Sequence, residues 1–213
     1  MWRRFLPVCK PMRYLYTFLL FFSTLLVAFL AGKVGASEMV QRKIVHMGVG
    51  NWWFLEMRLF PTMGDALVLP ALFILLNGLY IVFRQGESER RKNFGLVYYP
   101  VALVVLVILQ YRAGLASLAC LTGVLCMAYG DSFAAMIGTT WGKKNLPWYM
   151  SQKTWLGFGV MFLASLIVSL LTLRSFPVAL LVALVAAVLE AATPYGLDNL
   201  SVPIIVALVA GVL

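Results

Sequence analysis

The chain alternates between long apolar segments and short polar connectors. Eight apolar segments occupy residues 15–31, 43–60, 62–83, 95–111, 113–138, 155–173, 176–193 and 199–213. Several of them approach or exceed the roughly 17–25 residues that an α-helix needs to cross a bilayer. The apolar runs are continuous, whereas a membrane β-barrel would show short alternating segments. The pattern therefore predicts an all-α fold, a polytopic membrane helical bundle of about seven to eight transmembrane helices.

Two of these segments fit the pattern less well. Segment 43–60 carries His46, Glu56 and Arg58, and segment 199–213 is short for a full crossing. If all eight segments cross, the basic residues 1–14 lie outside, against the positive-inside rule. Two alternatives therefore stay open at the N-terminus. Segment 43–60 is re-entrant, or residues 1–31 are a signal peptide cleaved near the small residues 34–36.

Composition supports one membrane domain spanning residues 1–213. The chain is 62% hydrophobic and 12% charged, while soluble domains carry about 25% charged residues. The net charge is +9, but most Lys and Arg residues lie between apolar runs, where they orient the chain and meet anionic lipid. Nucleic acid is therefore not an expected partner. Three cysteines provide no disulfide framework, and one histidine excludes a multi-histidine metal site.

Three connectors are long enough to hold chemistry: residues 84–93, 139–153 and 194–199. If the last five segments all cross, these connectors share one side of the membrane. Their Lys and Arg content makes that side cytoplasmic. Eight crossings would place Arg42, Lys43 and His46 on the same side.

Three acids stand where hydrocarbon should exclude them. Asp131 lies inside an apolar run, Glu190 near the end of another, and Asp198 between two more. A carboxylate in a membrane is costly, by roughly 2.5–3.5 kcal/mol on insertion scales, unless it meets water, a cation or a partner. Together with the amide of Asn199, these acids form a credible oxygen-ligand set for a divalent ion. The plain alternatives are a helix N-cap at residues 198–199 and an acid at 190 that reaches the interface.

Basic and small residues near these acids suggest a phosphate site. Lys153-Thr154 could bind phosphate as a charge and a donor, although this motif taken alone is more typical of a flanking lysine at a membrane entry. Small residues recur every four positions, close to one per helical turn, at Gly130, Ala134, Gly138 and Gly142, which also fits a packing stripe. The spacing is not that of a Walker loop.

Two further groups are candidates only in combination with that site. Lys43 and His46 share a helix face and would lie beside the phosphate, although a lone interfacial histidine is more often structural. Tyr98 and Tyr99 open a segment, where an interfacial aromatic belt is expected.

Taken in order, these motifs resemble the family of CTP-dependent polyprenol and lipid kinases. That family includes dolichol kinase, phytol and farnesol kinases and CTP-dependent diacylglycerol kinase, and is distantly related to phosphatidate cytidylyltransferase. The matching residues are Arg42-Lys43-x-x-His46, Gly95-x-x-Tyr98-Tyr99, Gly130-Asp131 through Gly138 and Gly142-Lys143, Lys153-Thr154, and Glu190 through Asp198-Asn199 to Pro203, a motif region of about 42–203. Two features depart from the family. Leu156 stands at a usual glutamate, and no arginine lies between Gly138 and Gly142.

The resemblance implies transfer of the γ-phosphoryl group of CTP to the hydroxyl of an isoprenoid alcohol such as phytol, farnesol or a polyprenol. It implies Mg²⁺ held by Asp131 and Asp198, with Asn199 or Glu190 assisting. The remaining assignments are nucleotide binding by Arg42, Lys43, Gly130, Gly138, Gly142, Lys143 and Thr154, catalytic roles for Lys153 and His46, and contact with the lipid by Tyr98 and Tyr99. The expected setting is a prokaryotic plasma membrane or the endoplasmic reticulum, with the site facing the cytoplasm.

Three other functions stay open on the sequence. Two are transferases with the same fold, a CTP-dependent diacylglycerol kinase and a phosphatidate cytidylyltransferase. The third is a small cation-coupled transporter. Transporter sites usually lie at the midplane on broken helices within repeats, whereas this chain shows no convincing repeat and two of its acids lie near segment ends.

Overall fold

The computed structural model describes residues 6–84, 94–147 and 153–213. Within these ranges every predicted apolar segment is helical, and the only β-type pairing is an isolated bridge between Asn145 and Thr154. The helices are α1 (Lys10–Lys33), α2 (Glu38–Leu59), α3 (Met63–Arg84), α5 (Gly95–Arg112), α6 (Ser117–Leu125), the π-helix η1 (Cys126–Asp131), α7 (Ser132–Trp141), α8 (Trp155–Leu173), α9 (Phe176–Ala192) and α10 (Asp198–Val212). The predicted all-α bundle is confirmed.

Five of the described helical stretches are long and apolar enough to cross a membrane. They are Lys10–Lys33, Met63–Phe83, Gly95–Arg112, Ser117–Trp141 and Trp155–Leu173, while α9 and α10 are shorter apolar helices. Ser117–Trp141 combines α6, η1 and α7 into one continuous helix.

Local signals explain where several helices begin. The Ser37 side chain accepts a hydrogen bond from the Val40 backbone N–H at the start of α2, and Thr154 does the same for Gly157 at the start of α8. Prolines occupy the first turns of α1 and α9, where no intrahelical N–H bond is lost. Short polar side chains and prolines at these positions therefore set the helix boundaries.

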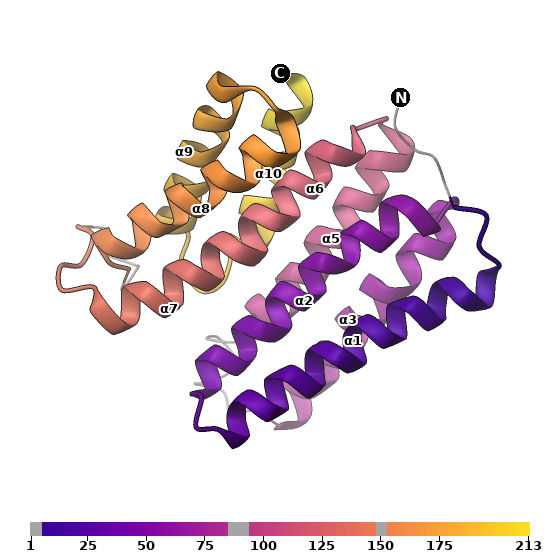
Figure 1. Cartoon of the computed structure of the whole chain (residues 1–213), viewed down its shortest axis with the longest axis horizontal. Helices are drawn as coiled ribbons and strands as arrows, with labels where there is room; N and C mark the ends of the chain where they lie inside the picture. Colours follow the sequence, from indigo (N-terminus) through magenta and orange to yellow (C-terminus); the bar gives the residue numbers. More distant parts are fainter. Residues whose placement is uncertain (1–5, 85–93, 148–152) are drawn as a thin grey trace.

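The continuous helix α6–η1–α7 forms the centre of the bundle (Figure 1). α10 packs against α6 and α5, α8 packs against α7 and α9, and α2 contacts the centre from the other side. α1 lies along α2, and α3 lies along α5. Fully buried apolar side chains such as Leu106, Val124, Met127 and Val206 fill the space between these helices.

α2 is a single uninterrupted helix of 22 residues. A re-entrant segment reverses direction within itself, so that alternative for segment 43–60 is wrong. Glu56 is an acid within this mainly apolar segment, and it is fully buried. The Gln110 side-chain amide donates to both of its carboxylate oxygens, at 2.8 and 3.0 Å. Cleavage of residues 1–31 stays a prediction.

Candidate active site beside the central helix

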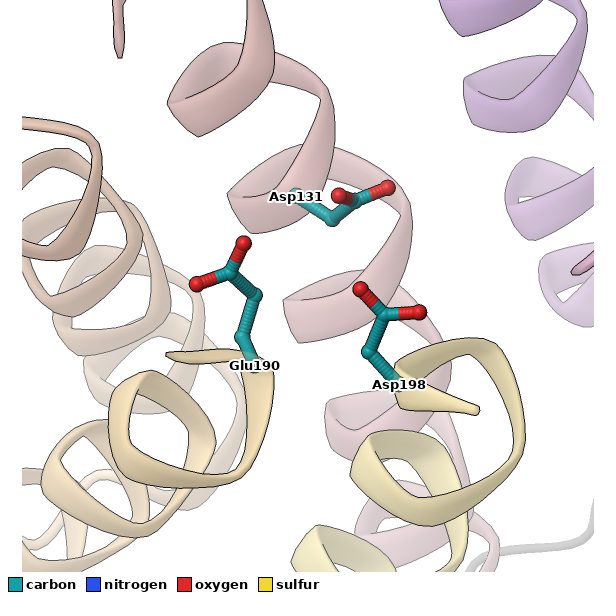
Figure 2. Close-up of side chains that lie close together, drawn as sticks. All are labelled: Asp131, Glu190 and Asp198. Carbon is teal, nitrogen blue, oxygen red and sulfur yellow. The ribbon is translucent and has the colours of Figure 1, made fainter. Parts of the chain in front are cut away.

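Three carboxylates from three different elements meet at one point of the bundle (Figure 2). Asp131 ends the π-helix η1, Glu190 lies in the last turn of α9, and Asp198 is the first residue of α10. One oxygen from each lies within 4.8 Å of the others, and none of the three residues is more than 7% exposed. The three acids that the sequence placed in separate segments therefore form one buried cluster.

The backbone before Asp131 departs from a regular α-helix. η1 covers Cys126–Asp131, and a π-turn of this kind widens a helix locally and often occurs at functional sites. Gly130 precedes the acid and faces α8, where an added Cβ would lie 2.5 Å from the Met161 sulfur. The missing side chain allows α8 to approach, which closes one side of the cluster.

A tight turn between α9 and α10 positions Asp198. Tyr195 and Gly196 both have positive φ, 56° and 79°. A Cβ on Gly196 would lie 2.8 Å from the backbone of Gly95, so the turn packs directly on the start of α5. The Asn199 amide donates to the Gly196 carbonyl at 3.2 Å and to Asp198 Oδ1 at the same distance. Asn199 thus helps to hold the turn as well as the acid.

Two lysines neutralise the carboxylates. Lys43 forms an ion pair with Asp131. Lys153 bridges the other two acids, with its Nζ 2.7 Å from both Glu190 Oε1 and Asp198 Oδ2. Burial alone would lower the pKa of Lys153, but the carboxylates of Asp198 and Glu190 outweigh it and raise that pKa above its usual value. Lys153 therefore stays charged at neutral pH.

His46 lies on the α2 side of the cluster. Its Nε2 is 3.9 Å from Asp131 Oδ2, and its ring packs on Tyr99 with centroids 4.1 Å apart. This nitrogen is buried and has no hydrogen-bond partner among the described residues. It is therefore positioned to contact a group that enters beside Asp131.

A cavity of about 400 Å³ opens next to the cluster. Its polar end is formed by Lys43, His46, Asp131, Asp198 and Asn199. The rest of its wall is mainly apolar and comes from α1, α2, α3 and α5, with Phe21, Leu25, Val45, Val49, Phe73, Leu96 and Pro100. The cavity therefore combines one charged end with a hydrocarbon-like body.

The structure separates the predicted site residues into two groups. Arg42, Lys43, His46, Tyr99, Asp131, Asp198 and Asn199 line the cavity, with Glu190 and Lys153 joined to them by ion pairs. Others do not line it. Tyr98 packs against Phe94, Lys143 is exposed, and Thr154 caps α8. Tyr98 and Lys143 therefore contribute no wall to this cavity.

The three glycines pack as the plain alternative expected. A Cβ on Gly138 would lie 3.1 Å from the Gly157 backbone, and one on Gly142 would lie 2.4 Å from Thr154 Oγ1. Close approach of α7 to α8 accounts for these glycines by itself. Their role in binding a nucleotide stays a prediction.

Asn77 is a cavity residue that the sequence analysis missed. Pro100 in α5 has no N–H, so the Leu96 carbonyl four residues earlier lacks its helical partner. The Asn77 side-chain amide donates to that carbonyl at 2.7 Å. An amide inside the apolar segment 62–83 was the available signal, but only the packing of α3 on α5 shows its partner.

Comparison with known proteins agrees with this site. A phytol kinase from Synechocystis sp. is 33% identical over 186 residues, which cover 80% of this chain and 78% of that protein. The chain belongs to the phytol and polyprenol kinase family.

Relatives from plants support the assignment of this chain to the phytol and polyprenol kinase family. A probable chloroplastic phytol kinase from Triticum aestivum is 29% identical over 208 residues, covering 81% of this chain and 67% of its own length. A probable chloroplastic phytol kinase 1 from Oryza sativa is 31% identical over 206 residues, which cover 80% of this chain and 63% of that protein. No family model matches the chain, and no solved structure matches it. The family resemblance inferred from the motifs is confirmed.

The carboxylate cluster of this kinase family member fits a hard divalent cation. Mg²⁺ prefers carboxylate and amide oxygens, and such oxygens are supplied by the three acids and by Asn199. Glu190 Oε2 is buried without a hydrogen-bond partner among the described residues, so it is an oxygen ready to accept one more contact. The donor set thus matches the ion that the resemblance implies.

The main departure from the family motif lies beside the site. Leu156 is the second residue of α8, and 41% of it is exposed. The leucine at the usual glutamate position therefore does not fill a core site. A charged side chain would be accommodated there without burial.

Proposed function

We propose that this protein is a membrane-embedded kinase that transfers the γ-phosphoryl group of CTP to the hydroxyl of an isoprenoid alcohol of the phytol type. One observation carries the proposal. Three buried carboxylates and two lysines converge at one end of a cavity whose other walls are largely apolar. The charged end suits phosphates, and the apolar body suits a lipid tail. The relatives, which are named phytol kinases, support the choice of acceptor.

Phosphoryl transfer depends mainly on positioning and on neutralising charge. Asp131 and Asp198 would hold Mg²⁺, with Glu190 or Asn199 assisting, and the ion would supply positive charge to the phosphate oxygens. Lys43 and Lys153 contact these same acids. Their ammonium groups are therefore within reach of a phosphate bound at the cluster, which they would bind as point charges.

The acceptor hydroxyl would lie at the polar end of the cavity. Its oxygen forms the new bond to the γ-phosphorus while the bond to the bridging oxygen breaks and CDP leaves. The hydroxyl proton passes to His46 Nε2, the buried nitrogen that has no partner among the described residues. Asp131, 3.9 Å away, would stabilise the resulting imidazolium.

The reaction setting follows from where the acids lie. Glu190 and Asp198 stand at the helix ends that flank the connector 194–199, and Asp131 lies beside them inside the central helix, whose end at Trp141 leads into the connector 139–153. We propose that this side is cytoplasmic, because the connector 139–153 and residues 84–93 are basic. The lipid alcohol would reach the site from the bilayer, and CTP from the cytoplasm.

One experiment tests the donor and the reaction type. Purified protein is incubated with Mg²⁺, a panel of phytol, geranylgeraniol, a long polyprenol, diacylglycerol and phosphatidate, and CTP labelled at either the γ- or the α-phosphate. We expect γ-label on a prenol and no α-label on any lipid. Transfer of α-label to phosphatidate would show cytidylyl transfer instead. Equal rates with ATP and CTP would contradict the choice of donor alone.

The same panel tests the acceptor. We expect prenols to have the highest kcat/KM. A diacylglycerol value more than tenfold above every prenol, about 1.4 kcal/mol of discrimination, would overturn the acceptor while leaving a lipid kinase.

A further inference from the structure

The cavity reaches the outside of the bundle at two chemically different places. Arg42 lines it at the charged end and is exposed, close to the connector side of α2. Leu25 also lines it and is 57% exposed, but it lies in the apolar helix α1. A residue that both lines a cavity and is exposed marks where that cavity opens. One opening is therefore cationic, and the other faces hydrocarbon.

The apolar opening lies on the seam between α1 and α3. Leu25 and Phe21 are one turn apart on α1, and Asn77 and Phe73 are one turn apart on α3. All four line the cavity. Beyond them, Asp65 at the start of α3 fastens α1 through Lys10 at 2.8 Å and Tyr14 at 3.3 Å. The seam is thus tied at the end away from the carboxylates and hollow at the end beside them.

Phe21 and Phe73 meet across this seam between the hollow part and the tied part. Their rings contact edge to face, with centroids 5.0 Å apart and planes at 88°. Each helix continues past this pair toward Asp65 and Tyr14 for roughly 10 Å, at about 1.5 Å per residue. The two rings therefore close the inner end of the cavity.

We propose that the seam between α1 and α3 binds the tail of the acceptor alcohol and that the Phe21–Phe73 pair is its floor, which sets the tail length that the site prefers. The alcohol enters sideways at Leu25, and its tail lies against the apolar wall until it meets the two rings. This inference rests on the proposed function, because it assigns the tail of the acceptor proposed there.

Replacing Phe73 by Ala tests the floor. Removal of one ring opens the cavity toward Asp65 and gives a longer tail room. We expect the ratio of kcat/KM for a long polyprenol to that for farnesol to rise about tenfold, the scale of discrimination by small changes in an apolar pocket. The KM for CTP should stay within twofold. Phe21→Ala should act in the same direction, and Phe73→Leu gives a milder change should Ala impair folding.

Phe22→Ala is the matched control. It removes the same ring from the next position of α1, but Phe22 is 56% exposed and does not line the cavity. For this variant, the ratio of kcat/KM for a long polyprenol to that for farnesol should equal the ratio of the parent. Unchanged ratios in the folded Phe73 and Phe21 variants, with prenol kinase activity intact, would overturn the floor and leave the proposed function standing.

A second readout needs no catalysis. A geranylgeraniol probe with a photoreactive diazirine at the tail end is bound to the parent protein, and the crosslinked peptides are identified by mass spectrometry. We expect label on the α1 and α3 peptides that contain Phe21 and Phe73, with less after Phe73→Ala. Label confined to other helices would overturn the inference even in an inactive preparation. Absence of phosphoryl transfer with correct labelling would count against the proposed function alone.

Discussion

Lys153 is the residue on which the stability of the carboxylate cluster depends most. It contacts two buried acids on different helices, whereas Lys43 serves Asp131 alone. Three carboxylates within 4.8 Å would repel one another strongly in a medium of low polarity. The two lysines remove most of this repulsion. We therefore expect substitutions of Asp131 and Asp198 to lower mainly the activity, and substitution of Lys153 to lower the stability of the fold.

Asp131→Asn and Asp198→Asn should each lower Mg²⁺-dependent activity by at least about a hundredfold, because an amide keeps the shape but loses the charge that would hold the ion. Initial rates at saturating Mg²⁺ measure the effect. Asp65→Asn is the control. This acid also pairs with a lysine, but it lies in the first turn of α3, away from the three carboxylates. Activity within threefold of the parent at saturating Mg²⁺ would assign Asp131 and Asp198 to structure.

Lys153→Met should destabilise the protein by about 3 kcal/mol, because it leaves Glu190 and Asp198 buried without their cation. The pKa of Lys153 is raised in the folded protein. The stability that charged Lys153 gives the folded protein is therefore fully present at pH values below its unfolded pKa of about 10.4. It is lost only as pH rises through the higher pKa of the folded state. The deficit of the variant should be constant between about pH 7 and 9.

The free energy of unfolding in detergent measures this deficit, and Lys153→Arg, which keeps the charge, should recover part of it. A Lys153→Met protein as stable as the parent would mean that the acids find another cation.

At the scale of elements, α3 and α5 are joined by a proline and an amide. Pro100 frees the Leu96 carbonyl, and Asn77 satisfies it from the neighbouring helix. A polar interaction inside the apolar part of the bundle thus fixes how the two helices face each other at the cavity wall.

Asn77→Leu should destabilise the protein by about 1–3 kcal/mol, because the Leu96 carbonyl then lacks a partner. Adding Pro100→Ala to this variant restores a backbone N–H four residues after Leu96 and should recover much of the loss. A double-mutant cycle on unfolding free energies isolates this coupling. Strictly additive effects would show that the carbonyl is satisfied in another way.

At the scale of the whole molecule, the described helices bring the ends of the connectors before α8 and before α10 to the carboxylates. We propose that the side on which these connectors lie is cytoplasmic. Lys144 is exposed in the connector before α8, and Arg112 is exposed at the opposite end of α5.

In a Cys9→Ser background, Lys144→Cys should react with a membrane-impermeant maleimide only in permeabilised cells, and Arg112→Cys in intact cells. Cys120 and Cys126 are fully buried and serve as the internal control. The reverse labelling pattern would invert the topology and place the site outside.

The apolar pattern of the sequence by itself determined the helices and pointed to the site. Transfer of apolar residues out of water and the cost of a carboxylate in hydrocarbon are local properties, so eight segments and three misplaced acids were visible without any structure. Ordered motifs added the family, which the comparison with a relative confirmed.

Distances between segments far apart in the chain were decided only by the tertiary structure. The Lys153 bridge, the partner of Asn77 and the Phe21–Phe73 contact each join two helices, and no local pattern encodes how those helices pack. The glycines at 130, 138 and 142 show the same limit, because their spacing fits both a phosphate site and a packing face. Only the packing of α8 and its N-cap Thr154 against these glycines shows which contacts they make, since close approach of two helices is a property of the pair and not of either sequence alone.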